Sequence, residues 1–289
     1  PTSALYGFVG ILNRILKEHE PDYLGVVFDS PGPSFRSEMY GEYKSNRPPM
    51  PDDLRVQIEK AKKILHAMEV PRFEVGGYEA DDVIATLVRL AGDTDTETWV
   101  VSVDKDLYQL IDSRVRMLRH HMDKEEVIDE DGVVKKLGVR ADQVADYLAL
   151  VGDSSDNVPG VPGIGAKSAV QLLQQFDNLE SLLEDADRIE KARWRNLLNE
   201  HAESARLSKR LILLRQDAPV SLDLSALHWK KVVTPRLQDL YRELEFQKFL
   251  QDLGGVALEK RTVEYGIIRT EEALEDLVQA ARDTGRIAV

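Results

Sequence analysis

The chain has 289 residues, of which 43% are hydrophobic and 31% charged, a composition typical of a soluble globular protein. It contains no cysteine, which excludes disulfides and thiolate metal sites, so a bound metal would need oxygen or histidine ligands. No apolar run approaches the roughly 18 residues of a membrane-spanning helix, and the apolar stretch at residues 4–15 lacks the features of a signal peptide. The net charge of −13 argues against a uniformly basic nucleic-acid-binding surface, but local basic patches remain compatible with it.

The first half of the chain alternates helical patterns with short apolar runs, which predicts an α/β fold. The spacing predicts helices over residues 1–19, 52–68 and 79–90, buried parallel strands over 23–28 and 98–103, and a hairpin over 116–127. Asp52 is expected to cap its helix. His120 and His121, in the hairpin, are interpreted as surface residues because no partner motif accompanies them.

Acidic residues gather at four places: after each predicted strand, at the start of the helix over 79–90, and in a small polar run near residue 155. They are Asp29, Glu79, Asp81, Asp82, Asp104, Asp106, Asp153 and Asp156. Each has an ordinary explanation as a turn residue, a cap or a response to the helix dipole. Open α/β sheets, however, bring the carboxyl ends of their strands together. Packed acids then need cations, and two divalent ions about 4 Å apart would suit phosphodiester hydrolysis. Oxygen ligands indicate Mg²⁺ or Mn²⁺.

Residues 31–51 interleave basic with aromatic side chains. Arg36, Lys44 and Arg47 alternate with aromatic rings such as Tyr43, a pattern that suits phosphate contact and base stacking on single-stranded nucleic acid. A solvated loop is the alternative. Its length, near twenty residues, favours a functional role.

A glycine-rich run, residues 152–172, leads into a predicted helix over 167–175. Gly160, Gly163 and Gly165 allow backbone N–H groups to approach an anion at the helix N-terminus. A P-loop is disfavoured because Ala166 stands where that motif needs lysine. The run is better explained as a helix–hairpin–helix that grips a nucleic-acid backbone. An ordinary glycine-rich connection is the alternative.

The second half of the chain is predicted to be mainly helical, with a last helix over 233–253. We expect one domain over residues 1–255, with an α/β part at 1–137 and a helical part at 138–255 that carries the helix–hairpin–helix at about 145–175. Residues 256–289 predict strand–helix–strand, the start of another domain.

Five motifs together carry a family resemblance. They are VVFD (26–29), FRSEMYGEYKSNRPPMPDDL (35–54), GYEADDV (77–83), SVDKDLYQL (102–110) and GDSSDNVPGVPGIGAKSA (152–169). The chain resembles the 5′-nuclease domain of bacterial DNA polymerase I, a relative of the flap endonucleases. The resemblance implies a PIN/flap-endonuclease-like, mostly parallel sheet flanked by helices, followed by a helical region. It implies a 5′→3′ exonuclease and flap endonuclease for primer removal and DNA repair, in a parent chain that is also a DNA polymerase.

The same resemblance assigns residues. The eight acids would ligate two Mg²⁺ or Mn²⁺ ions or support the ligands, and Lys44 and Arg47 would act catalytically at the scissile phosphate. The expected DNA contacts are Arg36, Tyr43, Lys44, Arg47, Gly160, Gly163, Ile164, Gly165, Lys167 and Ser168. A potassium or sodium ion is expected at the hairpin. The expected partner is DNA with a 5′ flap, nick or RNA primer, bound by a monomer in the bacterial cytoplasm, at the nucleoid and away from membranes.

One departure concerns the start of the chain. The family's first strand, which ends in an Asp-Gly that supplies a metal ligand, would precede Pro1. Without it we expect weakened or lost activity. A non-catalytic, structure-specific DNA-binding module is therefore the alternative function.

Overall fold

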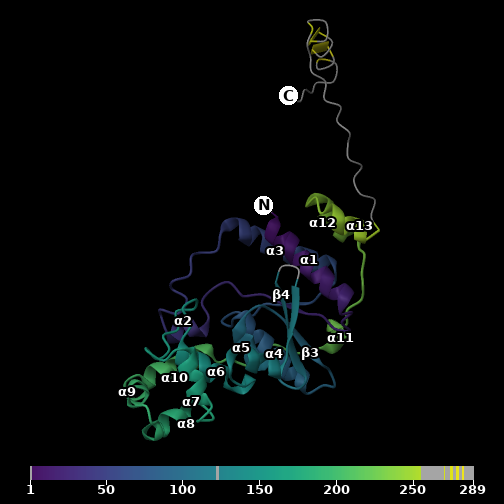
Figure 1. Ribbon diagram of the computed structural model, residues 1–289. Coiled ribbons are helices and arrows are strands. Elements are labelled where there is room, and N and C mark those ends of the chain that lie inside the picture. Colours follow the sequence, from purple (N-terminus) through teal and green to yellow (C-terminus); the bar gives the residue numbers. More distant parts are fainter. Residues whose placement is uncertain are drawn as a thin grey trace. The chain divides into compact units, whose positions relative to one another are not determined.

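The computed structural model describes residues 2–121 and 124–254, together with residues 270, 274, 275, 278, 279 and 282. The chain divides into two compact units, Pro1–Leu237 and Gln238–Val289. The strand–helix–strand pattern predicted over 256–289 falls outside the described residues, apart from the six isolated positions. Figure 1 shows the elements in chain order.

The predicted amphipathic helices are confirmed. Helix α1 (Ser3–Glu18) buries Leu5, Val9 and Leu12, which are spaced for a single helix face, and packs against α3 (Asp52–Ala67). The expected cap is shifted by one residue, because Pro51 is the N-cap of α3 and Asp52 is the first helical residue. Helix α4 (Ala80–Gly92) begins with a capping box, and it contacts strands from both sheets.

The strands form two small sheets within the described residues. Strand β1 (Val26–Val27) pairs in parallel with β2 (Arg72–Phe73). Strand β3 (Thr98–Val101) pairs in parallel with β4 (Val115–His121), which continues into the predicted antiparallel hairpin with β5 (Lys124–Ile128). The expectation that β3 is fully buried is wrong. Val100 is buried on one face of the sheet, whereas Trp99 and Val101, which point to the opposite face, are 38% and 42% exposed.

Helices make up most of the rest of the chain. The longer ones are α5 (Glu130–Leu137), α6 (Val144–Val151), α7 (Ala166–Leu173), α9 (Ala192–Glu200), α10 (Ala202–Ile212) and α12 (Pro235–Glu243). The short ones are α2 (Phe35–Met39), α8 (Leu179–Glu184), α11 (Leu224–Leu227), α13 (Gln247–Asp252) and the 3₁₀ turns η1 (Lys105–Leu110), η2 (Ala141–Gln143) and η3 (Ala186–Arg188). The single helix predicted over 233–253 is two helices, because Glu245 between them has a positive φ of 58°.

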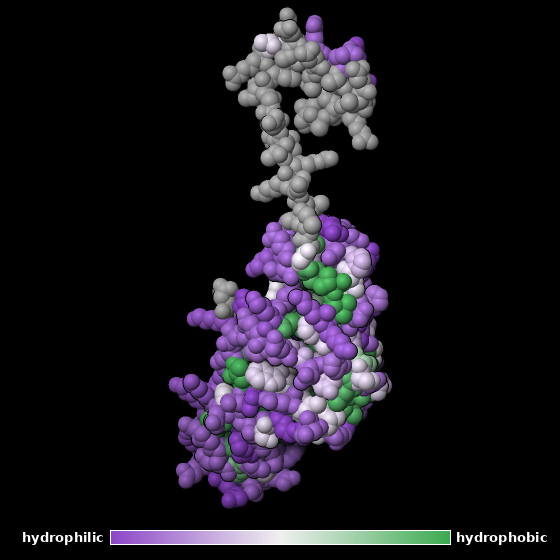
Figure 2. Space-filling view, turned by 90° about the vertical axis from the view of Figure 1, so that its right-hand side faces the viewer, coloured by the Kyte–Doolittle hydropathy of each residue, from purple (hydrophilic) through white to green (hydrophobic). Residues whose placement is uncertain are grey.

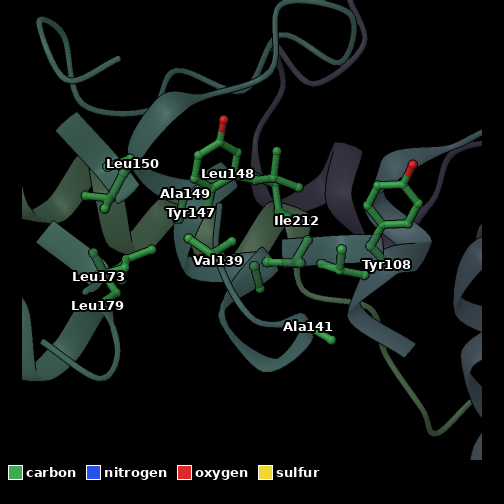
Figure 3. Packing of buried hydrophobic residues seen from close by; sticks show 14 of the residues in the cluster. Tyr108, Val139, Ala141, Tyr147, Leu148, Ala149, Leu150, Leu173, Leu179 and Ile212 are labelled. Atoms are coloured by element: carbon green, nitrogen blue, oxygen red, sulfur yellow. The ribbon is translucent and has the colours of Figure 1, made fainter. Parts of the chain in front are cut away.

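One continuous core joins the sheet to the helical part. Val100 and Met117 of the three-stranded sheet belong to the same buried cluster as Tyr108 of η1 and Leu148 of α6. Every residue of α6 before Val151 is buried, because α6 lies between η1, α7 and α10. Figure 3 shows this packing, and Figure 1 shows α6 to α10 gathered at one end of the first unit. The core therefore holds the turn after α6 against the sheet part.

Hydrophilic residues predominate on the face shown in Figure 2, with smaller hydrophobic patches between them. Among the described residues, none of the helices is long and apolar enough to cross a membrane.

Candidate metal centre and nucleic-acid interface

The ends of β1 and β3 and the start of α4 bring four acidic side chains together. Asp29 follows β1, and its Oδ1 accepts a 2.8 Å hydrogen bond from the backbone N–H of Ala80. Asp104 follows β3, and Asp81 lies in the first turn of α4. Burial first, and then the charges of Asp104, Asp29 and Glu79, raise the pKa of Asp81 to about 7. The ends of β1 and β3 therefore contribute to one acidic group, although the two strands belong to different sheets.

A second acidic group adjoins the first. Burial, and next the charge of Asp104, raise the pKa of Asp106 to about 7; Asp153 and Asp156 add to the rise, and Lys105 opposes it. Asp106 Oδ1 is buried and has no hydrogen-bond partner among the described residues. A buried carboxylate oxygen without a partner is costly, so this oxygen is suited to a ligand.

The donor set fits divalent cations. Carboxylate oxygens are the ligands that Mg²⁺ and Mn²⁺ prefer, and a cation would relieve both the unpartnered oxygen and the raised pKa values. We call the following residues the carboxylate cluster: Asp29, Glu79, Asp81, Asp104, Asp106, Asp153 and Asp156. Within the described residues no three of them have ligand atoms within 4.8 Å of one another.

Asp82 lies in the same turn of α4 but faces the interior. Its fully buried carboxylate accepts hydrogen bonds from Arg36 at 2.6 and 2.8 Å and from the backbone N–H of Arg215 at 2.9 Å. Arg36 is only 2% exposed and also donates to the carbonyls of Leu211 and Leu213. The sequence grouped Asp82 with the metal ligands and Arg36 with the DNA contacts. The structure instead places them in a buried ion pair that joins α2, α4 and the chain after α10, out of reach of DNA.

The segment after α2 places three polar side chains against the carboxylate cluster. The Tyr43 hydroxyl lies 3.1 Å from Glu79 Oε2 and 3.2 Å from Asp156 Oδ2. Burial, followed by these two charges, raises the pKa of Tyr43, so the phenol keeps its proton. Lys44 Nζ lies 2.9 Å from Glu79 Oε1, and Arg47 pairs with Asp156 while remaining 48% exposed. Two cationic side chains, Lys44 and Arg47, therefore border the carboxylate cluster, as a phosphate-binding site requires.

Lys105 is a site residue that the sequence pattern did not select. Its Nζ lies 2.6 Å from Asp153 Oδ2, and the backbone N–H of Ser155 donates to Asp153 Oδ1 at 2.7 Å. Burial would raise the pKa of Asp153, but these hydrogen bonds outweigh it and the pKa is lowered. The only hint in the sequence that Lys105 belongs to the site was its position between Asp104 and Asp106. No spacing rule predicts the ion pair between Lys105 and Asp153, because the two residues are 48 positions apart in the sequence.

The glycine-rich turn folds back tightly on the end of α6. A Cβ at Gly160 would lie 2.5 Å from the backbone nitrogen of Gly152, and both residues have positive φ. Only glycine tolerates these two constraints together. The N–H of Gly160 donates to the hydroxyl of Ser208, and its carbonyl accepts from the hydroxyl of Ser204. These two hydrogen bonds therefore hold the turn against α10.

The expected DNA contacts on this turn differ in exposure. Gly163, Gly165 and Lys167 are exposed just before α7 and in its first turn, and Ser168 is half-buried. Gly160 is buried and its N–H is bonded to Ser208, so the expectation that it contacts DNA is wrong. Ile164 is only 3% exposed, so its side chain anchors the turn in the core and cannot reach a ligand. The exposed start of α7, with its N–H groups and dipole, is a suitable place for phosphate.

Two family models match consecutive parts of the chain. Residues 1–138 match the 5′-3′ exonuclease N-terminal resolvase-like domain, and residues 139–234 match the 5′-3′ exonuclease C-terminal SAM fold. A 5′-3′ exonuclease from Aquifex aeolicus is 37% identical over 256 residues, which are 89% of this chain and 86% of the relative. The chain belongs to the 5′-3′ exonuclease family.

Relatives within this 5′-3′ exonuclease family include longer proteins. DNA polymerase I of Caldicellulosiruptor bescii is 42% identical over 258 residues, and the match covers 88% of this chain but 30% of that protein. A bacteriophage T5 flap endonuclease, solved as a complex with DNA and metal ions, matches with a TM-score of 0.62 at 22% identity over 86% of this chain and 89% of that one. The expected fold, a PIN-like part followed by a helical part, is confirmed.

Proposed function

We propose that this chain is the metal-dependent 5′ nuclease part of a bacterial DNA polymerase I, acting as a 5′→3′ exonuclease and flap endonuclease. The observation that carries the proposal is the carboxylate cluster with Lys44 and Arg47 at its border. Oxygen ligands beside cationic side chains suit a phosphodiester held with divalent ions. The names of the relatives, DNA polymerase I and 5′-3′ exonuclease, support the same reaction.

The carboxylate cluster would hold two Mg²⁺ or Mn²⁺ ions. When bound, such ions activate water for attack on a phosphodiester and stabilise the leaving oxygen. Lys44 and Arg47 would bind the scissile phosphate, exchanging their contacts with Glu79 and Asp156 for phosphate oxygens. Tyr43 would position this segment through its hydroxyl contacts with the same two acids.

The helix–hairpin–helix of α6 and α7 would bind the duplex part of the substrate. Lys167 and the N–H groups at the start of α7 contact backbone phosphates without reading base sequence. A potassium or sodium ion at this turn stays a prediction from the family resemblance. The substrate would be DNA with a 5′ flap, nick or RNA primer, cut by a monomer in the bacterial cytoplasm, at the nucleoid. Residues 1–255 would form the nuclease and 256–289 the start of a 3′→5′ exonuclease-like domain.

The test is cleavage of 5′-labelled flap DNA in Mg²⁺, with this chain and with the same chain extended by the family's Asp-Gly strand. In each of these two forms that cleaves the flap, Asp104→Asn should lower the cleavage rate at least about 100-fold and leave binding of the flap DNA unchanged. Asp95→Asn is the matched control, because Asp95 is exposed and precedes β3, at the opposite end from Asp104. Normal cleavage by Asp104→Asn would show that the metal assignment is wrong.

The alternative is a non-catalytic module that recognises DNA structure through the same hairpin. Its support is the exposed start of α7, which does not depend on the carboxylate cluster. Flap binding without cleavage by either form, in Mg²⁺ and in Mn²⁺, would favour this alternative.

A further inference from the structure

A cluster of histidine and glutamate side chains lies outside the carboxylate cluster, where the end of α1 meets the β4–β5 hairpin. Glu125 of β5 contacts two imidazoles: its Oε2 lies 3.0 Å from His19 Nε2, and its Oε1 lies 3.4 Å from His120 Nδ1. Ligand atoms of Glu18, His19 and Glu125 lie within 4.8 Å of one another. His19 and Glu125 are 106 residues apart, so the tertiary fold alone brings them together.

The buried imidazole of His120 is independent evidence for a ligand. The interpretation of His120 as a surface residue is wrong, because its side chain on β4 is only 7% exposed. Both His120 Nδ1 and the facing Glu125 Oε1 are buried and have no hydrogen-bond partner among the described residues. Two buried polar atoms that face each other unsatisfied are costly, and a cation bound by both would satisfy them.

We propose that this cluster binds a transition-metal ion of the Zn²⁺ class. His19 Nε2 and the carboxylates of Glu18 and Glu125, whose ligand atoms lie within 4.8 Å of one another, would be the first ligands, and His120 Nδ1, 3.4 Å from Glu125 Oε1, would complete the site. Two imidazoles with carboxylate oxygen suit Zn²⁺, whereas Mg²⁺ prefers oxygen ligands throughout. The bound ion would tie the end of α1 to the β4–β5 hairpin and so stabilise the folded chain.

Arg14 is the neighbouring group that opposes the site. Its Nη1 lies 3.4 Å from His120 Nε2. A metal at Nδ1 places the ring proton on Nε2, so this contact would be given up. The carboxylates of Glu18 and Glu125 offset the charge of the guanidinium, and the half-exposed His19 leaves a path for the ion to enter.

The test is a Zn²⁺ titration of the whole chain by calorimetry in excess Mg²⁺, with Co²⁺ absorption as a second readout. We expect one bound Zn²⁺, a Co²⁺ spectrum of imidazole–oxygen ligation, and a Zn²⁺-dependent rise in the thermal midpoint. His19→Ala and Glu125→Gln should each weaken Zn²⁺ binding at least about 100-fold. His201→Ala is the matched control and should change nothing, because His201 forms a similar pair with Glu200, 3.8 Å apart, elsewhere on the surface.

Three results would overturn the proposal. One is an absence of Zn²⁺ binding and of any Zn²⁺-dependent thermal shift in the wild-type chain. Another is unchanged Zn²⁺ affinity in both His19→Ala and Glu125→Gln, with their fold checked by circular dichroism. The third is loss of the bound Zn²⁺ in Asp104→Asn but not in His19→Ala, which would place the ion in the carboxylate cluster. The wild-type thermal shift needs no variant, so the test holds even if a substitution impairs folding.

Discussion

Replacing Arg36 with methionine should destabilise the protein by about 3–5 kcal/mol, because it leaves the Asp82 carboxylate buried without its charge partner. The guanidinium donates two bonds to Asp82, at 2.6 and 2.8 Å, and one each to the carbonyls of Leu211 and Leu213. Methionine retains much of the apolar stem, so packing is largely preserved. After the change, the backbone N–H of Arg215 is one of the few donors left to Asp82. The loss is therefore mainly electrostatic.

Urea unfolding followed by circular dichroism would measure this loss as a shift in midpoint. Arg36→Met/Asp82→Leu should recover most of the stability, because a buried ion pair can be replaced by apolar residues of similar volume at little cost. Arg47→Met is the matched control, since the exposed Arg47–Asp156 pair should contribute no more than about 1 kcal/mol. A cost below about 1 kcal/mol for Arg36→Met, or additive effects in the double variant, would refute the reasoning.

Four further predictions concern the hairpin and the carboxylate cluster. Gly160→Ala should disrupt the turn and abolish duplex binding, because the added Cβ would lie 2.5 Å from the backbone nitrogen of Gly152. Gly165→Ala is the control and should fold normally, because a Cβ added there has no neighbouring atom within 4 Å. Circular dichroism and fluorescence anisotropy check both, and equal behaviour of the two variants would contradict the assignment. Mn²⁺ affinity, measured by calorimetry, should rise with pH up to about 7 and then level off, because the ion must displace protons from Asp81 and Asp106, whose pKa values are about 7. The raised pKa values of Asp81 and Asp106 also mean that the folded state holds these protons more tightly than the unfolded state does. The thermal midpoint of the metal-free protein should therefore fall as pH rises from about 4 to 7. An Mn²⁺ affinity and a thermal midpoint that do not change with pH would contradict these two predictions. Lys167→Ala should weaken duplex binding equally for all sequences and lower the salt slope by about one unit, whereas a changed sequence preference would contradict backbone recognition.

The sequence alone was sufficient to predict most of the local elements. The apolar spacing of α1 and α3, the short apolar strands and the glycines of the α6–α7 turn are each specified by neighbours within a few residues. The approach of Asp29 and Asp104 to Asp81 was also expected, because both aspartates follow predicted parallel strands. The sequence did not show that β1 and β3 belong to two separate small sheets. These inferences need only periodicity and one topological rule.

Only the tertiary structure decided which polar side chains pair with one another. Asp81 and Asp82 are adjacent, but successive helical positions point about 100° apart, so one faces the carboxylate cluster and the other the interior. Arg36 meets Asp82 across 46 residues, and His19 meets Glu125 across 106. No spacing rule connects such residues, because their contact depends on how whole helices and strands pack.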